Sequence, residues 1–333
     1  MRKTKQYILC GLLLCSLLVI PSAQADDQGV LANLAACKDF GFSTEEDFVT
    51  RGPMPADGNP IISDGDLLGP NHAVCARNAE LLAPWKVQAD LGLDAVDIVS
   101  VDLSLVSFST ELDDPAGRFT AGDLLATNGA AIPNIVLLKK FQINHDMGLD
   151  GLQFIGPVQG IIDFLNRAAV ISRAQWLANP GLLFELLQTF KVDIWISTES
   201  TELRAAVFSI LDGDLLSVGT GTIVVHQADL LPLAVPAGLP ARGVDFGLDA
   251  VAASRNGDIR TLRFSTEILY RKEPSFTDGD VLKKGDGIEY LNGALVAPFE
   301  PYARFLGLDA LHINLPPTAT RLGYLPYVLK TAR

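Results

Sequence analysis

The chain has 333 residues, 48% of them hydrophobic, and a formal net charge of −13. This apolar content is typical of a globular protein rather than a disordered one. The acidic excess repels the phosphates of nucleic acids and acidic membrane surfaces, so it excludes nucleic-acid binding and favours cations or basic partners.

Residues 1–25 have the pattern of a secretory signal peptide. Arg2, Lys3 and Lys5 precede an apolar run from Tyr7 to Ile20, and the motif Ala23-Gln24-Ala25 is a typical cleavage site. The run is shorter than the ~20 residues of a membrane span, and no later stretch reaches that length. We therefore expect an exported protein, periplasmic or extracellular, with no membrane span after cleavage.

Four cysteines are present, and Cys10 and Cys15 would leave with the signal peptide. Cys37 and Cys75 remain as an even pair in an oxidising compartment, which favours a disulfide. Two buried free thiols are the alternative. The sequence contains no Cys-x-x-Cys or Cys/His zinc spacing.

Three short markers recur in the same order four times. The first is FSTE or ISTE, the second is Gly-Asp followed by an apolar pair, and the third is GLDA or GLDG. They occupy residues 42–45, 64–68 and 92–95, then 108–111, 121–125 and 148–151, then 196–199, 212–216 and 247–250, then 264–267, 278–282 and 307–310. Such self-similarity is the signature of a repeat architecture.

One unit predicts about four short antiparallel strands. In the last unit GLDAVAAS alternates, Asn256-Gly257 favours a tight hairpin turn, and IRTLRFSTE gives a second strand. DVLKK and IEYLN give the third and fourth, and the apolar pair after Asn292 fits a strand end or one helical turn. About 60 residues with four strands is the size of a propeller blade.

The ends of the chain suggest how the units close. The chain enters at FSTE, in the middle of a unit, and the last GLDALHI strand could complete that unit. The units resemble GLDA/FSTE/GDLL-type repeats of uncharacterised bacterial secreted proteins. The resemblance covers about residues 40–313, implies propeller-like blades and implies no activity. An open solenoid is the alternative, which pairing of GLDALHI beside FSTE would exclude.

The predicted fold is therefore all-β: a four-bladed, propeller-like repeat protein closed by its C-terminal strand, with a small helical insertion. Residues 26–333 form one domain, with units at about 40–91, 92–147, 148–246 and 247–313. Residues 154–191 form the insertion, which has helical spacing and predicts two helices. These helices would cover a sheet edge or serve as a lid or partner surface.

Each unit supplies three acidic positions. If the GLDA strands lie innermost, four aspartates ring a central channel, where carboxylates suit Ca²⁺. The alternative is that these repeated residues are scaffold that fixes turns. The candidate ligands are Asp94, Asp150, Asp249 and Asp309; the other repeated acids are Glu45, Glu111, Glu199 and Glu267, and Asp66, Asp123, Asp214 and Asp280.

Catalysis would depend on residues unique to one unit. The sequence has no G-x-S-x-G elbow, H-E-x-x-H motif or EF-hand loop. His72, His145 and Asp146 in one pocket would favour an enzyme, whereas His226 and His312 lie in strand-like runs and are interpreted as structural. We name no catalytic or cofactor-binding residue.

The sequence thus favours an exported, non-enzymatic binding or scaffold protein, with a protein, glycan or cation as its partner. The second hypothesis is an extracytoplasmic hydrolase, possibly metal-assisted, with its site at one mouth of the ring. A unique cluster of polar residues would favour the enzyme, and repeated carboxylates alone would favour binding.

Overall fold

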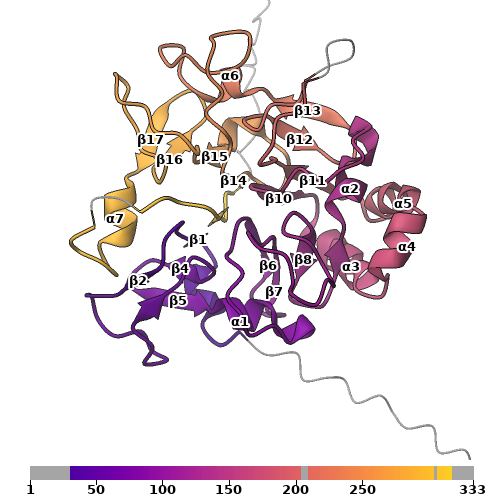
Figure 1. Cartoon of the computed structure of the whole chain (residues 1–333), viewed down its shortest axis with the longest axis horizontal. Helices are drawn as coiled ribbons and strands as arrows, with labels where there is room; N and C mark the ends of the chain where they lie inside the picture. The colour runs from indigo at the N-terminus through magenta and orange to yellow at the C-terminus, as the bar shows by residue number, and fades with distance from the viewer. Residues whose placement is uncertain (1–30, 204–208, 304–305, 317–333) are drawn as a thin grey trace, which may run out of the picture.

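The computed structural model describes residues 31–203, 209–303 and 306–316. The expected signal peptide lies outside these residues. Four four-stranded antiparallel sheets surround a common centre (Figure 1), and a two-stranded ribbon, β2 (Phe48–Val49) with β3 (Ile61–Ile62), lies beside the first. No helix among the described residues is long and apolar enough to cross a membrane.

Each sheet begins with the strand that follows a GLDA-type motif. We number the sheets I to IV. Sheet I is β18 (Leu311–Ile313), β1 (Phe40–Phe42), β4 (Leu67–Gly69) and β5 (Ala73–Ala76). Sheet II is β6 (Val96–Ser100), β7 (Leu105–Phe108), β8 (Leu124–Ala126) and β9 (Ala131–Ile132).

The other two sheets repeat this order. Sheet III is β10 (Leu152–Ile155), β11 (Asp193–Ile196), β12 (Leu215–Ser217) and β13 (Thr222–Val225). Sheet IV is β14 (Val251–Ala252), β15 (Arg263–Phe264), β16 (Val281–Lys283) and β17 (Gly287–Tyr290). The first strands are neighbours around the centre: β6 and β14 each contact both β10 and β18.

The predicted pairing of the two ends of the chain is confirmed. Strand β18 pairs antiparallel with β1, with Phe40 opposite Ile313 and Phe42 opposite Leu311. The C-terminal GLDALHI segment therefore completes the sheet that the N-terminal FSTE segment begins, which excludes an open solenoid.

The predicted all-β, closed propeller class is wrong. The structure has about 21% helix and 23% strand, and its five small sheets remain separate without forming a closed barrel or propeller. One reason is that the apolar pair after the Asn or Gln that follows the fourth strand of each sheet lies in a helical turn. These turns are α1 (Asn78–Leu81), α2 (Asn134–Leu137), α6 (Gln227–Leu230) and α7 (Asn292–Val296).

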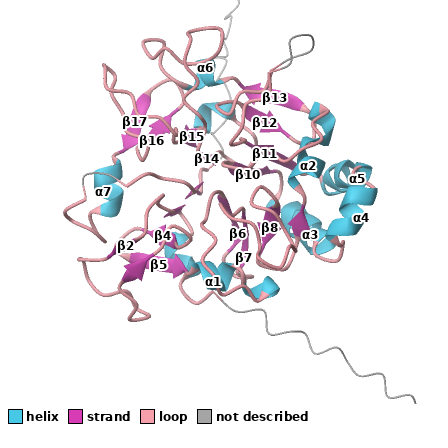
Figure 2. Ribbon diagram, in the orientation of Figure 1, coloured by secondary structure: helices cyan, strands magenta, loops and turns pink. Residues whose placement is uncertain are grey.

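Short 3-10 helices add further helical content. They lie at Leu34–Cys37, Ala83–Trp85, Leu138–Phe141 and Ile259–Thr261. The last of these replaces part of the strand expected for IRTLRFSTE. Figure 2 shows how loops and short helices separate the sheets.

The insertion contributes three helices rather than two: α3 (Val158–Ala168), α4 (Arg173–Ala178) and α5 (Gly181–Phe190). They leave sheet III between β10 and β11 and reach sheet II, where α3 contacts β6 and α4 contacts the edge strand β9; Phe164 of α3 also packs against Phe154 of β10 in sheet III. Phe164, Trp176 and Leu183 are fully buried in this contact. The helices thus cover a sheet edge, the first of the two roles considered for them.

The core lies between neighbouring sheets. One apolar cluster fills each of the four gaps, from sheets I and II round to sheets IV and I. In β6, Val96 and Ile98 pack toward sheet I, whereas Val99 packs toward sheet III. A strand buried on both faces loses the polar alternation of a half-exposed strand, which explains the near-continuous apolar runs of this sequence.

The predicted disulfide is confirmed. Cys37 and Cys75 are bonded, with their Cα atoms 6.0 Å apart. The bond joins the Leu34–Cys37 turn to β5, the outermost strand of sheet I.

Candidate metal centre

Eight carboxylates gather where the first strands begin. The aspartate of each GLDA-type motif comes two residues before a first strand, and the glutamate of each STE motif follows the second strand of a sheet. We call these eight residues the carboxylate ring: Glu45, Asp94, Glu111, Asp150, Glu199, Asp249, Glu267 and Asp309. The aspartates are buried, with 3–8% of their surface exposed, whereas the glutamates are open to solvent on one part of their surface and covered on the rest.

Glycine at the start of the motif allows this approach. Gly148 has φ +76°, a conformation that favours glycine, and a Cβ at this position would collide with the carboxylate of Glu199. Gly92 and Gly247 have the same conformation and face Glu111 and Glu267. The motif is therefore Gly-Leu-Asp because a larger first residue would displace the glutamate of the same sheet.

Each aspartate also faces the glutamate of the next sheet. Asp94 of sheet II lies near Glu199 of sheet III, and Asp249 of sheet IV lies near Glu45 of sheet I. Asp309 of sheet I faces Glu111 of sheet II, and Asp150 of sheet III faces Glu267 of sheet IV; two such carboxyls can hydrogen-bond to each other only when one of them carries a proton. The ring thus interlocks all four sheets.

Two groups of three carboxylates are close enough to share an ion. One is Glu45, Asp249 and Asp309, and the other is Asp94, Asp150 and Glu199; within each group the ligand oxygens lie within 4.8 Å of one another. Oxygens on opposite sides of a Ca²⁺ ion are separated by about 5 Å, because each lies at about 2.3–2.6 Å from the metal. Both groups therefore fit a cation of this size.

Several of these oxygens have no hydrogen-bond donor. Both carboxylate oxygens of Asp150 are buried without a partner, and so are Oδ2 of Asp94 and Oδ2 of Asp309. Asp249 differs, because the Ser265 hydroxyl donates to its Oδ2 at 3.0 Å. A buried carboxylate without a donor is costly, so it must carry a proton or bind a cation.

The pKa values show the same cost. Burial, and then repulsion from the neighbouring carboxylates, raises the pKa of each ring aspartate well above its ordinary value. Burial raises the pKa of Glu45, Glu111 and Glu267 to about 7 and also raises that of Glu199. Near neutral pH the ring therefore holds protons until positive charge replaces them.

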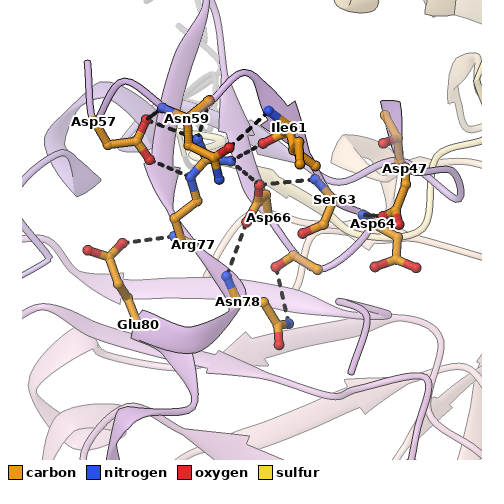
Figure 3. Close-up of polar contacts among 12 residues, drawn as sticks. Asp47, Asp57, Asn59, Ile61, Ser63, Asp64, Asp66, Arg77, Asn78 and Glu80 are labelled. Carbon is orange, nitrogen blue, oxygen red and sulfur yellow. Dashed lines mark hydrogen bonds and ion pairs between the residues drawn. The ribbon is translucent and has the colours of Figure 1, made fainter. Parts of the chain in front are cut away.

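The Gly-Asp turn carries the second set of repeated aspartates, and these are scaffold. Figure 3 shows the first example: Asp66 accepts hydrogen bonds from the backbone N–H groups of Ser63 and Asn78, and Arg77 donates to it. Asp123, Asp214 and Asp280 each accept the equivalent pair of backbone bonds. Because their oxygens already accept hydrogen bonds from the protein, these four aspartates are scaffold residues that fix turns rather than candidate metal ligands.

The amide after each turn links it to the ring. The Asn134 side chain donates to the carbonyls of Gly122 and Gly148, at 3.1 and 2.8 Å, and accepts from the N–H of Met147 at 3.0 Å. Asn78, Gln227 and Asn292 make matching bonds in the other units. Each amide fixes the start of the next GLDA-type motif.

In three of the four units the serine of the STE motif ties neighbouring sheets together; the Ser197 hydroxyl of the fourth is buried without a hydrogen-bond partner. Ser43 and Ser109 donate to the carbonyls of Leu93 and Leu149, at 2.8 and 2.7 Å, and Ser265 shares its one hydroxyl proton between Asp249 and the carbonyl of Leu308, which lies at 3.3 Å. Each of these leucines precedes a ring aspartate. The backbone on both sides of the ring is therefore held in place independently of any ion.

The residues considered for catalysis do not form one cluster. The ring of His72 packs against Phe299, His145 lies 3.5 Å from Glu202, and Asp146 accepts a bond from Thr120. The exposed His226 contacts Asp214, and of the four histidines only His312 is buried. Comparison with known proteins adds no relative: no family model, curated protein or solved structure matches the chain.

Proposed function

We propose that this protein is an exported, non-enzymatic binding or scaffold module whose centre holds divalent cations, with Ca²⁺ the preferred ion. The observation that carries the proposal is Asp150, whose two carboxylate oxygens are buried, lack donors and lie in a group with Asp94 and Glu199. A cation would satisfy oxygens that the protein leaves unpaired.

The ligand chemistry favours calcium over magnesium. All the candidate ligands are carboxylate oxygens, and the glutamates are open to water that could complete six to eight ligands. Magnesium demands a near-ideal octahedron and gives up its own water reluctantly. The strongly acidic composition of the chain favours binding of either cation.

Export is part of the proposal. The Cys37–Cys75 disulfide is typical of oxidising compartments, and the pattern of residues 1–25 agrees with passage to the periplasm or the cell exterior. A protein or glycan partner would then meet the ordered module outside the cytoplasm. The hydrolase hypothesis has no comparable observation in its favour, because the unique histidines and Asp146 have separate partners.

The test is thermal unfolding of residues 26–333 in EDTA, in Ca²⁺ and in Mg²⁺, at pH 8. We expect a clear rise in Tm with Ca²⁺ and a smaller one with Mg²⁺. Equal Tm values in all three buffers would contradict the proposal and would mean that the ring is a protonated scaffold.

A further inference from the structure

The two groups of three carboxylates occupy equivalent places in the carboxylate ring. Each contains the ring aspartates of two neighbouring sheets and the STE glutamate of the second of these sheets. Because the backbone repeats, a difference in cation binding between the groups would come from the side chains around them. The first group, from sheets II and III, is Asp94, Asp150 and Glu199, and the second group, from sheets IV and I, is Asp249, Asp309 and Glu45.

The two groups differ in the hydrogen bonds that their carboxylates receive. In the described part of the chain, three aspartate oxygens of the first group are buried without a donor: both oxygens of Asp150 and Oδ2 of Asp94. In the second group Oδ2 of Asp309 is in this state, but Asp249 accepts a hydrogen bond from the Ser265 hydroxyl at 3.0 Å. A donor stabilises a carboxylate before any ion arrives, so a cation that binds there gains less free energy.

The serine of the STE motif accounts for part of this difference. Ser197 occupies in sheet III the place that Ser265 has in sheet IV. Its hydroxyl is buried but has no partner among the described residues, so it does not donate to Asp150. The hydroxyl lies instead beside Gly151, where an added Cβ would be only 2.4 Å from it. The other three units have alanine at this position of the motif, and its methyl group would close that space.

Missing donors are not a general feature of the buried carboxylates of this protein. Near the opposite end of the first strands the side chain of Asp97 is 1% exposed, and both terminal nitrogens of Arg255 bond its carboxylate, one of them at 2.7 Å. Gln153 and the Phe154 N–H donate to the same carboxylate, at 3.1 and 2.8 Å, and Nδ1 of His312 lies 3.4 Å from it. This carboxylate obtains its partners from the chain itself. The unpaired oxygens of the first group therefore point to a ligand that the chain does not supply.

We propose that the first group is the primary cation site, which fills first, and that the second group is the secondary site, which fills at higher Ca²⁺ concentration. The inference rests on the proposed cation centre and specifies its order of loading. The primary site should bind Ca²⁺ about fivefold more tightly, which is the effect of about one hydrogen bond. Between the two Kd values the protein holds one ion, between sheets II and III, while the like charges of sheets IV and I stay unneutralised. The module would therefore respond to Ca²⁺ in two steps.

Variants that leave one group intact measure the two affinities separately. Asp249→Asn keeps the first group complete, and Asp150→Asn keeps the second. Calorimetric titration of residues 26–333 with Ca²⁺ at pH 8 should give two ions for the parent chain and one for each variant. The Kd should be about fivefold lower in Asp249→Asn than in Asp150→Asn. Equal Kd values, or a lower Kd in Asp150→Asn, would overturn the proposal.

Ser265→Ala tests the cause of the difference. Without its donor, Asp249 has an unpaired oxygen, so the ion-free protein should be less stable and the secondary site should bind Ca²⁺ more tightly. In the Asp150→Asn background, where the second group alone is complete, the Kd should fall about fivefold, toward that of the primary site. Ser197→Ala in the same background is the matched control, because it removes a hydroxyl without a partner, and it should leave this Kd unchanged. An unchanged or higher Kd in Asp150→Asn/Ser265→Ala would count against the proposal.

The titrations also distinguish the order of loading from the cation centre itself. Two ions bound by the parent chain with equal Kd values in the two Asn variants would contradict the order of loading and leave the centre in place. A parent chain that binds no Ca²⁺ would contradict both. Thermal unfolding in EDTA verifies that each variant is folded. If an Asn variant does not fold, Ser265→Ala alone decides, because its two ions should bind with nearly equal Kd values, and two steps as far apart as those of the parent chain would overturn the proposal.

Discussion

Asp150→Asn is the sharpest perturbation of the carboxylate ring. Asparagine keeps the shape of the side chain but removes one negative ligand from the group of Asp94, Asp150 and Glu199. The second group, Glu45, Asp249 and Asp309, does not contain this residue. We therefore expect the variant to lose one of two cations and to retain the other.

The expected rise in Tm on Ca²⁺ binding follows from the length of the chain. Unfolding entropy of about 2.1 cal/mol/K per residue gives about 0.6 kcal/mol/K for a chain of about 300 residues. Saturation of one site at a hundredfold excess of Ca²⁺ over its Kd stabilises the folded state by about 2.7 kcal/mol. Each ion should therefore raise Tm by about 4 °C, so the parent chain gains about 8 °C and Asp150→Asn gains about 4 °C.

The assay is differential scanning calorimetry with and without Ca²⁺, together with calorimetric counting of bound ions. The variant Asp150→Asn/Asp309→Asn, which damages both groups, should show no Ca²⁺ effect. Asp102→Asn removes one charge from an exposed turn and should behave like the parent chain. If Asp150→Asn gains as much from Ca²⁺ as the parent does, the assignment of ligands is wrong.

Three further predictions concern stability. In EDTA, the free energy of unfolding should fall as pH rises from about 4.3 through about 7. The reason is that the pKa values of Glu45, Glu111 and Glu267 are raised to about 7 in the folded state, so the unfolded chain holds those protons less tightly. Urea titrations across this pH range check the sign, and Ca²⁺ should flatten the slope of stability against pH. Asn134→Ala removes three buried hydrogen bonds and should cost about 3 kcal/mol by urea unfolding, against less than about 0.5 kcal/mol for the exposed Asn166→Ala. Replacing both Cys37 and Cys75 with serine opens a loop spanning 38 residues and should cost about 3–4 kcal/mol by the same method; a cost near zero would show that sheet I holds this loop without the bond.

The repeat made the carboxylate ring predictable. Equivalent residues of equivalent units occupy the same place in each sheet, so four GLDA-type aspartates had to meet if the strands that follow them surround one centre. The sequence also predicted the pairing of β1 with β18, at the two ends of the chain, and the disulfide, because both depend on residues that a local pattern identifies.

Contacts between units were not predictable in the same way. Asp94 of one sheet lies near Glu199 of the next because of the way the sheets are rotated about the centre. No residue spacing within a unit determines that rotation. The sequence left open whether the apolar pair after each Asn or Gln is a strand end or a turn of helix, because a run of four residues such as Asn134–Leu137 fits both. The insertion was recognised, but its packing on sheet II as well as on its own sheet was not.

The ion pair of Asp97 and Arg255 was missed for a different reason. The search for repeated residues gives weight to what recurs, and Asp97 has Gln153, Ala252 and His312 as its counterparts. His312 was interpreted as structural because it lies in a strand-like run, and it is indeed buried. The cluster joins residues of all four sheets whose bonded pairs are 56 or more residues apart in sequence, so only the folded chain shows it.

The two ends of the first strands therefore follow opposite rules, and the difference has a physical basis. At the end where the strands begin, like charges converge, and this arrangement is stable only if protons or cations neutralise them. The four equivalent aspartates all need this neutralisation. At the other end, unlike groups compensate one another within the protein, since Arg255 neutralises Asp97 directly. Asp94 and Asp97 are separated by three residues, about 10 Å along an extended chain. A single set of strands can thus combine a repeated centre of like charges with a non-repeated group of side chains that is already neutralised and ordered.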